Sequence, residues 1–274
     1  PEISKRVVGL EDGKLVIRED YLSQQPETTG TESVTDASDP AINYDGTALA
    51  CLGDTGRSLY FFSGGKGQYL VKNKKMTAPS FDSFGWLWVA ESDGAVRAYN
   101  AASTNEKERS KGIEIPVSWR SGMTFSSLRI SHDGARVVVV GTRDGTAAVV
   151  MSGVVRDSSG TPKGFTEPVR VTSSITPRTA VWAGEQNLVV VNDKTGESEV
   201  TTPSGEETKF DRLDGVKSVP AAGNTSNMLA HRSDGSCYAL EECGRNRLIA
   251  FNRALQFAGK TVIPSGGWRG TPQS

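Results

Sequence analysis

The sequence predicts an all-β protein, a β-propeller made of four-stranded antiparallel blades. The first observation is a strand–turn–strand unit that recurs about every 40 to 50 residues, the repeat length of a propeller blade. The glycines at the second turn of each unit fall at positions 13, 56, 94, 145, 196 and 235. The second observation is that no segment has the pattern of an amphipathic helix longer than about two turns. Six units predict six blades, with five or seven as the alternatives.

The unit is clearest in residues 127–150. Leu128 and Ile130 alternate with polar neighbours, which indicates a strand with a period of about two residues. The four valines that follow have no polar face, which is typical of a strand buried on both sides. The pairs Asp133-Gly134 and Asp144-Gly145 stand before and after this run. Because glycine adopts positive φ without steric cost, each pair predicts a tight turn between strands.

The other units have the same order of an apolar strand, a turn and a second strand. They lie at residues 7–17, 42–62, 84–99, 180–196 and 228–240. The first copy is shorter than the others, and the chain from residue 255 onward can complete it. We therefore expect a single propeller domain over residues 1–274, in which the N-terminal and C-terminal segments close the ring together.

Loops account for the longer spacings between units. Residues 157–164 are rich in Ser, Gly and Pro, and residues 103–112 are rich in charge. Residues 24–39 contain few apolar side chains, so we expect them to be mobile. Residues 265–274 are expected to be frayed, as chain ends often are.

The composition excludes several classes of protein. The 274 residues carry 32 acidic and 31 basic side chains, and this balance gives no general reason to expect nucleic acid or an anionic membrane as a partner. No apolar run approaches the roughly 18 residues that span a bilayer. The chain starts at Pro1 without a secretion signal, so we expect that it has been trimmed. With two His and three Cys, a zinc cluster is not expected.

His132, Asp133 and Asp144 are the first candidates for a site, as ligands of a metal. The alternative is that Asp133 accepts a hydrogen bond from its own turn, as aspartates in turns commonly do. The residue equivalent to His132 in the earlier unit is Tyr44, which favours the alternative. The nucleophile motif Gly-x-Ser-x-Gly and a phosphate-binding loop are absent. We therefore predict no catalytic residue, no cofactor and no metal, and we place His132 on the surface of one rim.

Tryptophan and arginine residues indicate where a protein partner can bind. Trp86 and Trp88 share one face of a strand, so we expect them in the core between blades. Trp119 and Arg120 lie in a loop before the next unit. A Trp-Arg pair in a loop is typical of an interface hot spot, but packing of the Trp between two blades is the favoured alternative. The predicted interaction surface comprises Trp119, Arg120 and His132.

The cysteines allow one disulfide. In one continuous strand, Cys237 and Cys243 would be about 20 Å apart, too far to bond. A turn at Glu241-Glu242 would bring them within reach, and the outer strand would then cover residues 247–251. We predict this disulfide, and we expect Cys51 to be a buried apolar residue.

The unit at residues 128–137, Leu-Arg-Ile-Ser-x-Asp-Gly-Ala-Arg-Val, resembles the C-terminal propeller of the LpqB family of actinobacterial lipoproteins. The N-terminal Val8-Gly9-Leu10 with Gly13-Lys14-Leu15, and the Tyr44-Asp45-Gly46 unit, are similar to the same family. The resemblance implies an extracytoplasmic protein tethered by a lipidated Cys, with a smaller domain before the propeller; neither that Cys nor that domain is in this sequence.

The same resemblance implies a partner, the extracellular sensor region of an MtrB-type histidine kinase of a two-component system. The functional hypothesis is therefore a non-enzymatic interaction module on the outer side of the cell membrane. The alternative is a ligand-sensing or hydrolytic propeller that acts on a cell-envelope small molecule through its central channel. Polar side chains converging on the axis would favour that alternative.

Overall fold

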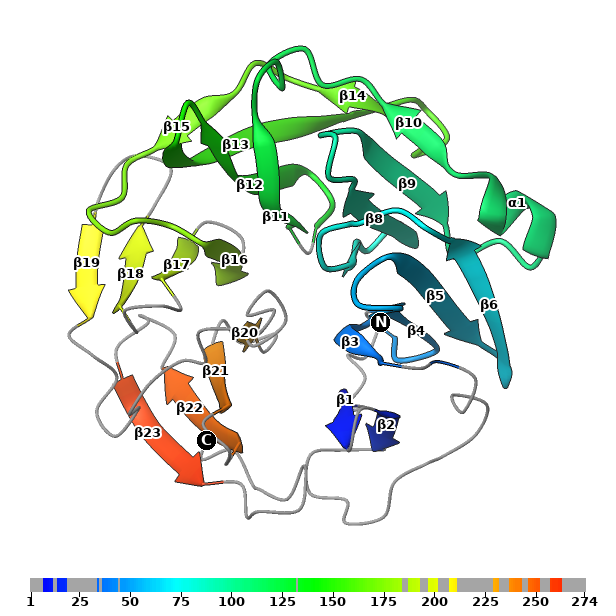
Figure 1. The fold of residues 1–274 in the computed structure, drawn as a ribbon, viewed down its shortest axis with the longest axis horizontal. Helices are drawn as coiled ribbons and strands as arrows, with labels where there is room; N and C mark the ends of the chain where they lie inside the picture. Colours follow the sequence, from blue (N-terminus) through cyan, green and yellow to red (C-terminus); the bar gives the residue numbers. More distant parts are fainter. Residues whose placement is uncertain are drawn as a thin grey trace.

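The strands of the chain lie in sheets around a ring (Figure 1). The computed structural model describes residues 7–11, 14–18, 34, 36–43, 45–131, 133–183, 187–192, 197–201, 207–210, 229–231, 237–242, 246–251 and 257–262. The described strands form six sheets, and all of their pairings are antiparallel. In five of the sheets, hydrogen-bonded neighbours follow one another in sequence over four strands.

The sheets follow the order of the chain. The first contains β1 (Val7–Glu11) and β2 (Lys14–Arg18). The second contains β3 (Ser38–Ile42), β4 (Ala48–Gly53), β5 (Ser58–Ser63) and β6 (Lys66–Val71). The third contains β7 (Ser80–Phe81), β8 (Trp86–Ala90), β9 (Val96–Asn100) and β10 (Ile113–Ile115). The fourth contains β11 (Thr124–Ile130), β12 (Arg136–Arg143), β13 (Thr146–Arg156), β14 (Pro162–Phe165) and β15 (Val169–Val171).

The last two sheets continue in the order of the chain. The fifth contains β16 (Thr179–Ala183), β17 (Asn187–Asn192), β18 (Glu197–Thr201) and β19 (Glu207–Phe210). The sixth contains β20 (Leu229–His231), β21 (Cys237–Glu242), β22 (Asn246–Phe251) and β23 (Phe257–Val262). The predicted class, an all-β propeller with four-stranded antiparallel blades, is confirmed. The number of blades and the extent of the domain stay predictions.

The turn between β12 and β13 has the predicted geometry. Asp144 and Gly145 both have positive φ, 51° and 77°, and the flanking residues Arg143 and Thr146 pair directly. This is the two-residue turn whose twist matches that of the strands. At the Asp133-Gly134 turn only Gly134 has positive φ, and the longer connection is held by the Asp133 carboxylate, which accepts a hydrogen bond from the Ala135 amide at 3.0 Å.

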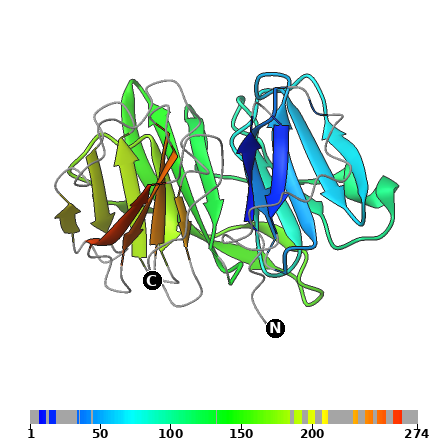
Figure 2. The same cartoon turned by 90° about the horizontal axis from the view of Figure 1, so that it is seen from below.

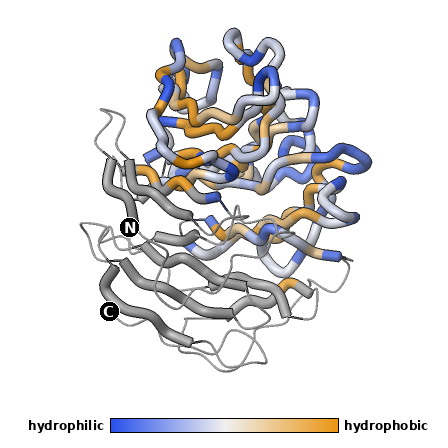
Figure 3. The backbone as a smooth tube through the Cα atoms, turned by 60° about the vertical axis from the view of Figure 1, so that its left-hand side comes forward, coloured by the Kyte–Doolittle hydropathy of each residue, from blue (hydrophilic) through white to orange (hydrophobic). Residues whose placement is uncertain are grey.

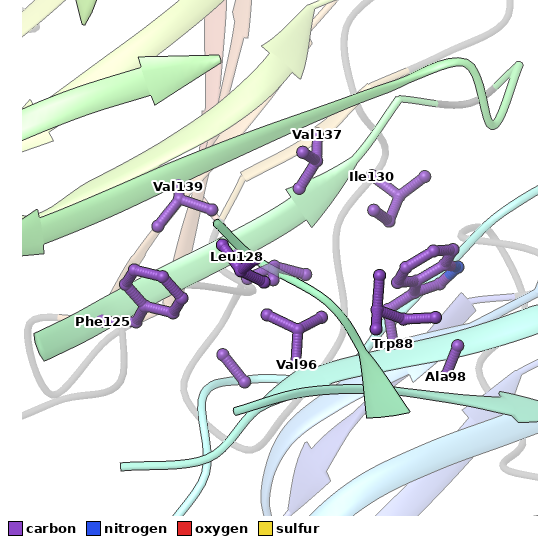
Figure 4. Packing of buried hydrophobic residues seen from close by; sticks show 11 residues of the cluster. Trp88, Val96, Ala98, Phe125, Leu128, Ile130, Val137 and Val139 are labelled. Carbon is purple, nitrogen blue, oxygen red and sulfur yellow. The ribbon is translucent and has the colours of Figure 1, made fainter. Parts of the chain in front are cut away.

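The valine run of β12 fills the spaces on both sides of its blade. Val137 and Val139 belong to the hydrophobic cluster shared with the third sheet, whereas Val138 and Val140 belong to the cluster shared with the fifth. In Figure 4, Trp88 and Val96 of the third sheet lie opposite Leu128, Val137 and Val139 of the fourth. The prediction of a strand buried on both faces is confirmed, because alternate side chains pack on different neighbouring blades.

The innermost strands of three consecutive sheets are joined by hydrogen bonds. The Ile130 amide donates to Oγ of Ser80 at 3.1 Å, the hydroxyls of Ser127 and Thr179 are 3.2 Å apart, and the Trp182 indole donates to the Arg129 carbonyl at 3.1 Å. Partners in these bonds are 50, 52 and 53 residues apart in sequence, one repeat length. The repeat therefore places equivalent strands side by side around the axis.

The turns gather at two ends of the blades, seen edge-on in Figure 2. One end, here the Phe84 rim, carries turns 82–85, 133–135 and 157–161 and the connection 101–112. The opposite end, here the Lys72 rim, carries turns 54–57, 91–95 and 144–145 and the connections 72–79 and 116–123. In Figure 3 the hydrophobic segments coincide mainly with strands, and the hydrophilic segments coincide mainly with turns.

Two loop predictions need correction. Residues 103–112 contain a short helix, α1 (Glu106–Lys111), which the side chain of Asn105 caps by accepting from the Lys107 amide. The segment 24–39, predicted to be mobile, includes the start of β3, where Asp39 is buried. Within the described part of the chain, no helix has the length and hydropathy needed to cross a membrane.

Candidate interaction site

Asp82 fixes the turn between β7 and β8. Its carboxylate is buried and accepts four hydrogen bonds. The amides of Phe84 and Trp86 donate to Oδ1, each at 2.9 Å, while the Trp88 indole and the Arg156 guanidinium donate to Oδ2 at 2.7 and 2.6 Å. A buried carboxylate is stable only when its oxygens are satisfied and its charge is paired. The turn is therefore held in one conformation.

Arg156 joins this turn to two others. Besides its bond to Asp82, the guanidinium donates to the Gly134 carbonyl at 3.0 Å and to the Gly160 carbonyl at 2.9 Å. The planar fork of an arginine suits several acceptors at fixed angles. One side chain at the end of β13 thus connects the turns 82–85, 133–135 and 157–161. We call this arrangement the three-turn cluster, with Asp82, Phe84, Gly134, Arg156 and Gly160 as its members.

Phe84 is the exposed centre of the three-turn cluster. Its side chain is 51% exposed, although its ring lies 4.3 Å from the Arg156 guanidinium carbon. Both glycines lie close against the ring, since an added methyl group would come within 2.8 Å of it at Gly134 and within 3.2 Å at Gly160. An aromatic ring supported by a paired arginine is fixed before any partner arrives. Such residues dominate the energy of protein interfaces.

The acidic residues around the cluster are occupied by their own turns. The hydroxyl of Ser159 and the ammonium of Lys163 bind the Asp157 carboxylate and lower its pKa to about 2. Burial raises the pKa of Asp133, but hydrogen bonds from Ser131 and Ala135 outweigh burial and lower the pKa overall. Both carboxylates are therefore engaged within their own turns, beside the exposed ring of Phe84.

Trp119 and Arg120 lie far from the three-turn cluster. They precede β11 on the Lys72 rim, whereas Asp133 follows the end of β11 on the Phe84 rim. The Trp119 ring packs against Phe125 and Phe165, with ring centroids 6.0 and 6.3 Å apart. These contacts place it in the core between two blades, the second of the two roles considered for it. Its role in an interaction surface stays a prediction.

His132 lies outside the described residues. Its neighbour Asp133 and the second predicted aspartate, Asp144, stand at opposite ends of β12, an eight-residue strand. At roughly 3.3 Å per residue, about 26 Å separates the two turns, so the two carboxylates cannot bind one ion. In the described ranges, no group of three His, Cys, Asp or Glu side chains is arranged to hold a metal.

The cysteine predictions have different outcomes. Cys51 is fully buried in β4, as expected, and burial together with the charge of Asp39 raises the pKa of its thiol to about 12. The turn predicted at Glu241-Glu242 is wrong, because β21 continues through both residues to pair Glu242 with Asn246. Because the backbone from Cys237 to Glu242 is extended, it carries the chain away from the Cys237 side chain and disfavours a disulfide to residue 243. Cys243 lies outside the described residues, so the Cys237–Cys243 disulfide itself stays a prediction.

The innermost strand β11 carries a buried charge beside the axis. Arg129 is 8% exposed and donates to the Pro79 carbonyl at 2.8 Å. Burial lowers the pKa of its guanidinium to about 10, and the nearby carboxylate of Asp39 acts in the opposite direction. The side chain therefore remains charged at neutral pH. Arg129 thus links β11 of the fourth sheet to the residue before β7 of the third sheet and to the charge of Asp39 in β3 of the second.

Sequence reasoning missed the members of the three-turn cluster. Phe84 is in step with Trp86 and Trp88, two and four residues later, so its apolar side chain fits the alternation of the strand and did not mark it as an exposed turn residue. Arg156 carried no signal either, since it ends a long strand next to a polar loop. Only the folded arrangement brings it to Asp82, 74 residues earlier in the chain.

Replacing Asp133 by Asn tests how much the charge of Asp133 contributes to the stability of the protein. Asn keeps an acceptor for the Ala135 amide but loses the charge that faces Arg136 at 3.6 Å. Because folding lowers the pKa of Asp133, the carboxylate stabilises the native state at neutral pH, and this contribution disappears as pH falls through 3.8 and below. We expect the variant to lose about 0.5 kcal/mol at pH 7 in urea unfolding. A difference between the two proteins that grows in acid would contradict this account.

A protein-family model matches most of the chain, and two curated proteins are similar to it in sequence. The family model described as "Lipoprotein LpqB beta-propeller domain" matches residues 13–242. Lipoprotein LpqB of Streptomyces avermitilis is 26% identical over 219 residues, which cover 71% of this chain and 35% of the relative. Lipoprotein LpqB of Streptomyces coelicolor is 27% identical over 177 residues, covering 57% and 27%. The chain thus spans about a third of the first relative's length.

Solved structures share the fold at low sequence identity. A nidogen/laminin complex contains a chain that matches with a TM-score of 0.59 and 10% identity, covering 90% of this chain and 89% of that one. A prolyl endopeptidase and a puromycin hydrolase match with TM-scores of 0.56 at 15% and 16% identity. This chain covers 41% and 46% of these two enzymes, respectively. At such identities the likeness concerns the propeller fold alone.

Proposed function

The chain belongs to the family of LpqB β-propeller domains, and we propose that it is the non-enzymatic interaction module of an extracytoplasmic lipoprotein that modulates a two-component sensor histidine kinase. The name of the relatives, lipoprotein, supports anchoring at the outer side of the cell membrane. The resemblance of the sequence to the family supports the extracellular region of an MtrB-type kinase as the partner.

The observation that carries this proposal is the fixed exposure of Phe84. Most large apolar side chains of the described residues are buried, and the ring of Phe84 is 51% exposed at a place where three turns hold it still. A rigid aromatic side chain loses little conformational entropy on binding, so most of its contact energy contributes to affinity. We propose that an apolar or aromatic side chain of the kinase domain packs on this ring.

Replacing Phe84 by Ser tests the proposed contact. Calorimetry with the extracellular domain of the kinase is expected to show an affinity at least about ten-fold lower than that of the wild-type chain. The backbone bond from the residue-84 amide to Asp82 does not depend on the ring. We therefore expect the free energy of unfolding to change by no more than about 1 kcal/mol.

Val169→Ser is the matched control. Val169 is similarly exposed, at 49%, but it lies in β15 at the outer edge of its sheet and away from the three-turn cluster. Its replacement is expected to leave the affinity unchanged. Equal losses in the two variants would move the binding surface away from Phe84. Absence of binding by a folded wild-type chain at high micromolar concentration would reject the kinase as the partner.

A further inference from the structure

A cluster of basic side chains occupies the Lys72 rim, at the end of the blades opposite the three-turn cluster. It comprises Arg57, in the turn between β4 and β5, and Lys72, Lys74 and Lys75, in the connection between β6 and β7. All four are exposed. The whole chain has a net charge of −1, so this concentration of positive charge is local.

Backbone hydrogen bonds hold the connection in place. The Lys74 amide donates to the Arg57 carbonyl at 2.8 Å, and the Ser92 amide donates to the Lys75 carbonyl at 2.9 Å. Asn73, directly before the first of these bonds, has positive φ, 63°, which turns the chain tightly at that point. The cations are thereby presented on a fixed loop that is bonded to the turns on both sides, so little entropy is lost when the loop meets a surface.

Nearby acids pair with only part of this charge. The carboxylate of Glu91 is buried and is shared by Lys74 and Arg97, at 2.7 and 2.8 Å. Two further carboxylates lie on this rim: Asp93 accepts from the Ala95 amide in its own turn, and Asp54 accepts from the Ser58 hydroxyl. Arg57, Lys72 and Lys75 have no ion pair among those described for the chain.

Tyr69 adds an amphipathic side chain beside the cluster. The Lys72 ammonium lies 4.3 Å from the centre of the Tyr69 ring, which itself meets Tyr60 edge-on at 5.1 Å. Tyrosine together with flexible lysines is the composition that proteins place at the boundary between water and lipid headgroups.

We propose that the Arg57–Lys72–Lys74–Lys75 cluster docks on an anionic phospholipid surface. Each basic residue close to such a surface contributes about 1 kcal/mol, which is too little for stable binding by one residue but enough for several acting together. This orientation would direct the three-turn cluster away from the bilayer. The inference goes beyond the proposed function and does not depend on the identity of the protein partner.

Charge reversal provides the test. Sedimentation with vesicles of phosphatidylcholine containing about a third phosphatidylglycerol is expected to show binding of the wild-type chain that disappears in pure phosphatidylcholine and weakens steeply with added salt. Lys72→Glu combined with Lys75→Glu is expected to lower the affinity at least about 30-fold, since two favourable residues are lost. Lys107→Glu with Lys111→Glu in α1 changes the net charge equally on the Phe84 rim, and it is expected to retain most of the binding.

Three outcomes would overturn this inference. They are equal binding to neutral and anionic vesicles, equal losses in the two charge-reversal variants, and no binding of the folded wild-type chain at low salt. The Phe84→Ser variant separates the two proposals, because it should bind anionic vesicles like the wild type. Conversely, Lys72→Glu with Lys75→Glu should bind the kinase domain like the wild type in the absence of lipid.

Discussion

Replacing Arg156 by Met is expected to lower the free energy of unfolding by about 3–5 kcal/mol, because it leaves a buried carboxylate without its cation. Asp82 would keep three N–H donors but lose the charge that balances it. The carbonyls of Gly134 and Gly160 would also lose their shared donor. Methionine fills a similar volume, so the loss reports the polar contacts more than a cavity. Urea unfolding at pH 7 measures it.

Two further variants make the Arg156 result specific. Lysine at position 156 keeps the charge but cannot reach three acceptors with one planar fork, so its loss should be intermediate. Arg170 lies exposed in β15, and Arg170→Met should change the stability by no more than about 0.5 kcal/mol. If Arg156→Met were as stable as Arg170→Met, the three turns would be held by something other than this side chain.

Arg129→Met is expected to cost a similar amount, about 3–5 kcal/mol, for a related reason near the axis. The substitution removes the donor to the Pro79 carbonyl and leaves the buried Asp39 without the charge that faces it. It affects contacts between three sheets, so we expect the thermal midpoint to fall by roughly 10 °C. Differential scanning calorimetry would measure the shift.

A second substitution separates charge pairing from packing at Arg129. Asp39 has a positive φ of 51°, a conformation that asparagine tolerates well. If the two charges are coupled, Asp39→Asn should recover much of the stability lost in Arg129→Met, because no carboxylate then remains buried without a counter-charge. Purely additive losses in the double variant would show that Arg129 acts through packing and its bond to Pro79 alone.

The fold could be predicted because its signals are local and repeated. The Asp144-Gly145 turn needs two positive φ values, which few residue pairs adopt easily, and the valines at 137–140 have no polar face. Each unit repeats these local rules, so an error in one unit does not change the class. The turn expected at Glu241-Glu242 was wrong because it rested on a single proposed cysteine pair and not on a repeated pattern.

The candidate site could not be predicted in the same way. Trp119 and Arg120 were chosen by residue type, but the Trp119 ring packs against Phe125 and Phe165. Residue type alone does not distinguish a tryptophan that packs between blades from one that awaits a partner. Asp82 and Arg156 are 74 residues apart, and their 2.6 Å contact depends on how two blades stand side by side. Such a contact follows from tertiary geometry, which one sequence does not contain.

The outer edge of the fourth sheet is divided between two short strands. β14 pairs with β13 over Val154–Arg156, and β15 pairs with it over Val149–Met151. Between them, Thr166 binds the Gly153 amide and carbonyl. A long, flat edge would offer a template for another chain, and exposed Val155 and Val169 would make it an adhesive one. An interrupted edge of four and three residues is too short for that, which favours molecules that stay separate at high concentration.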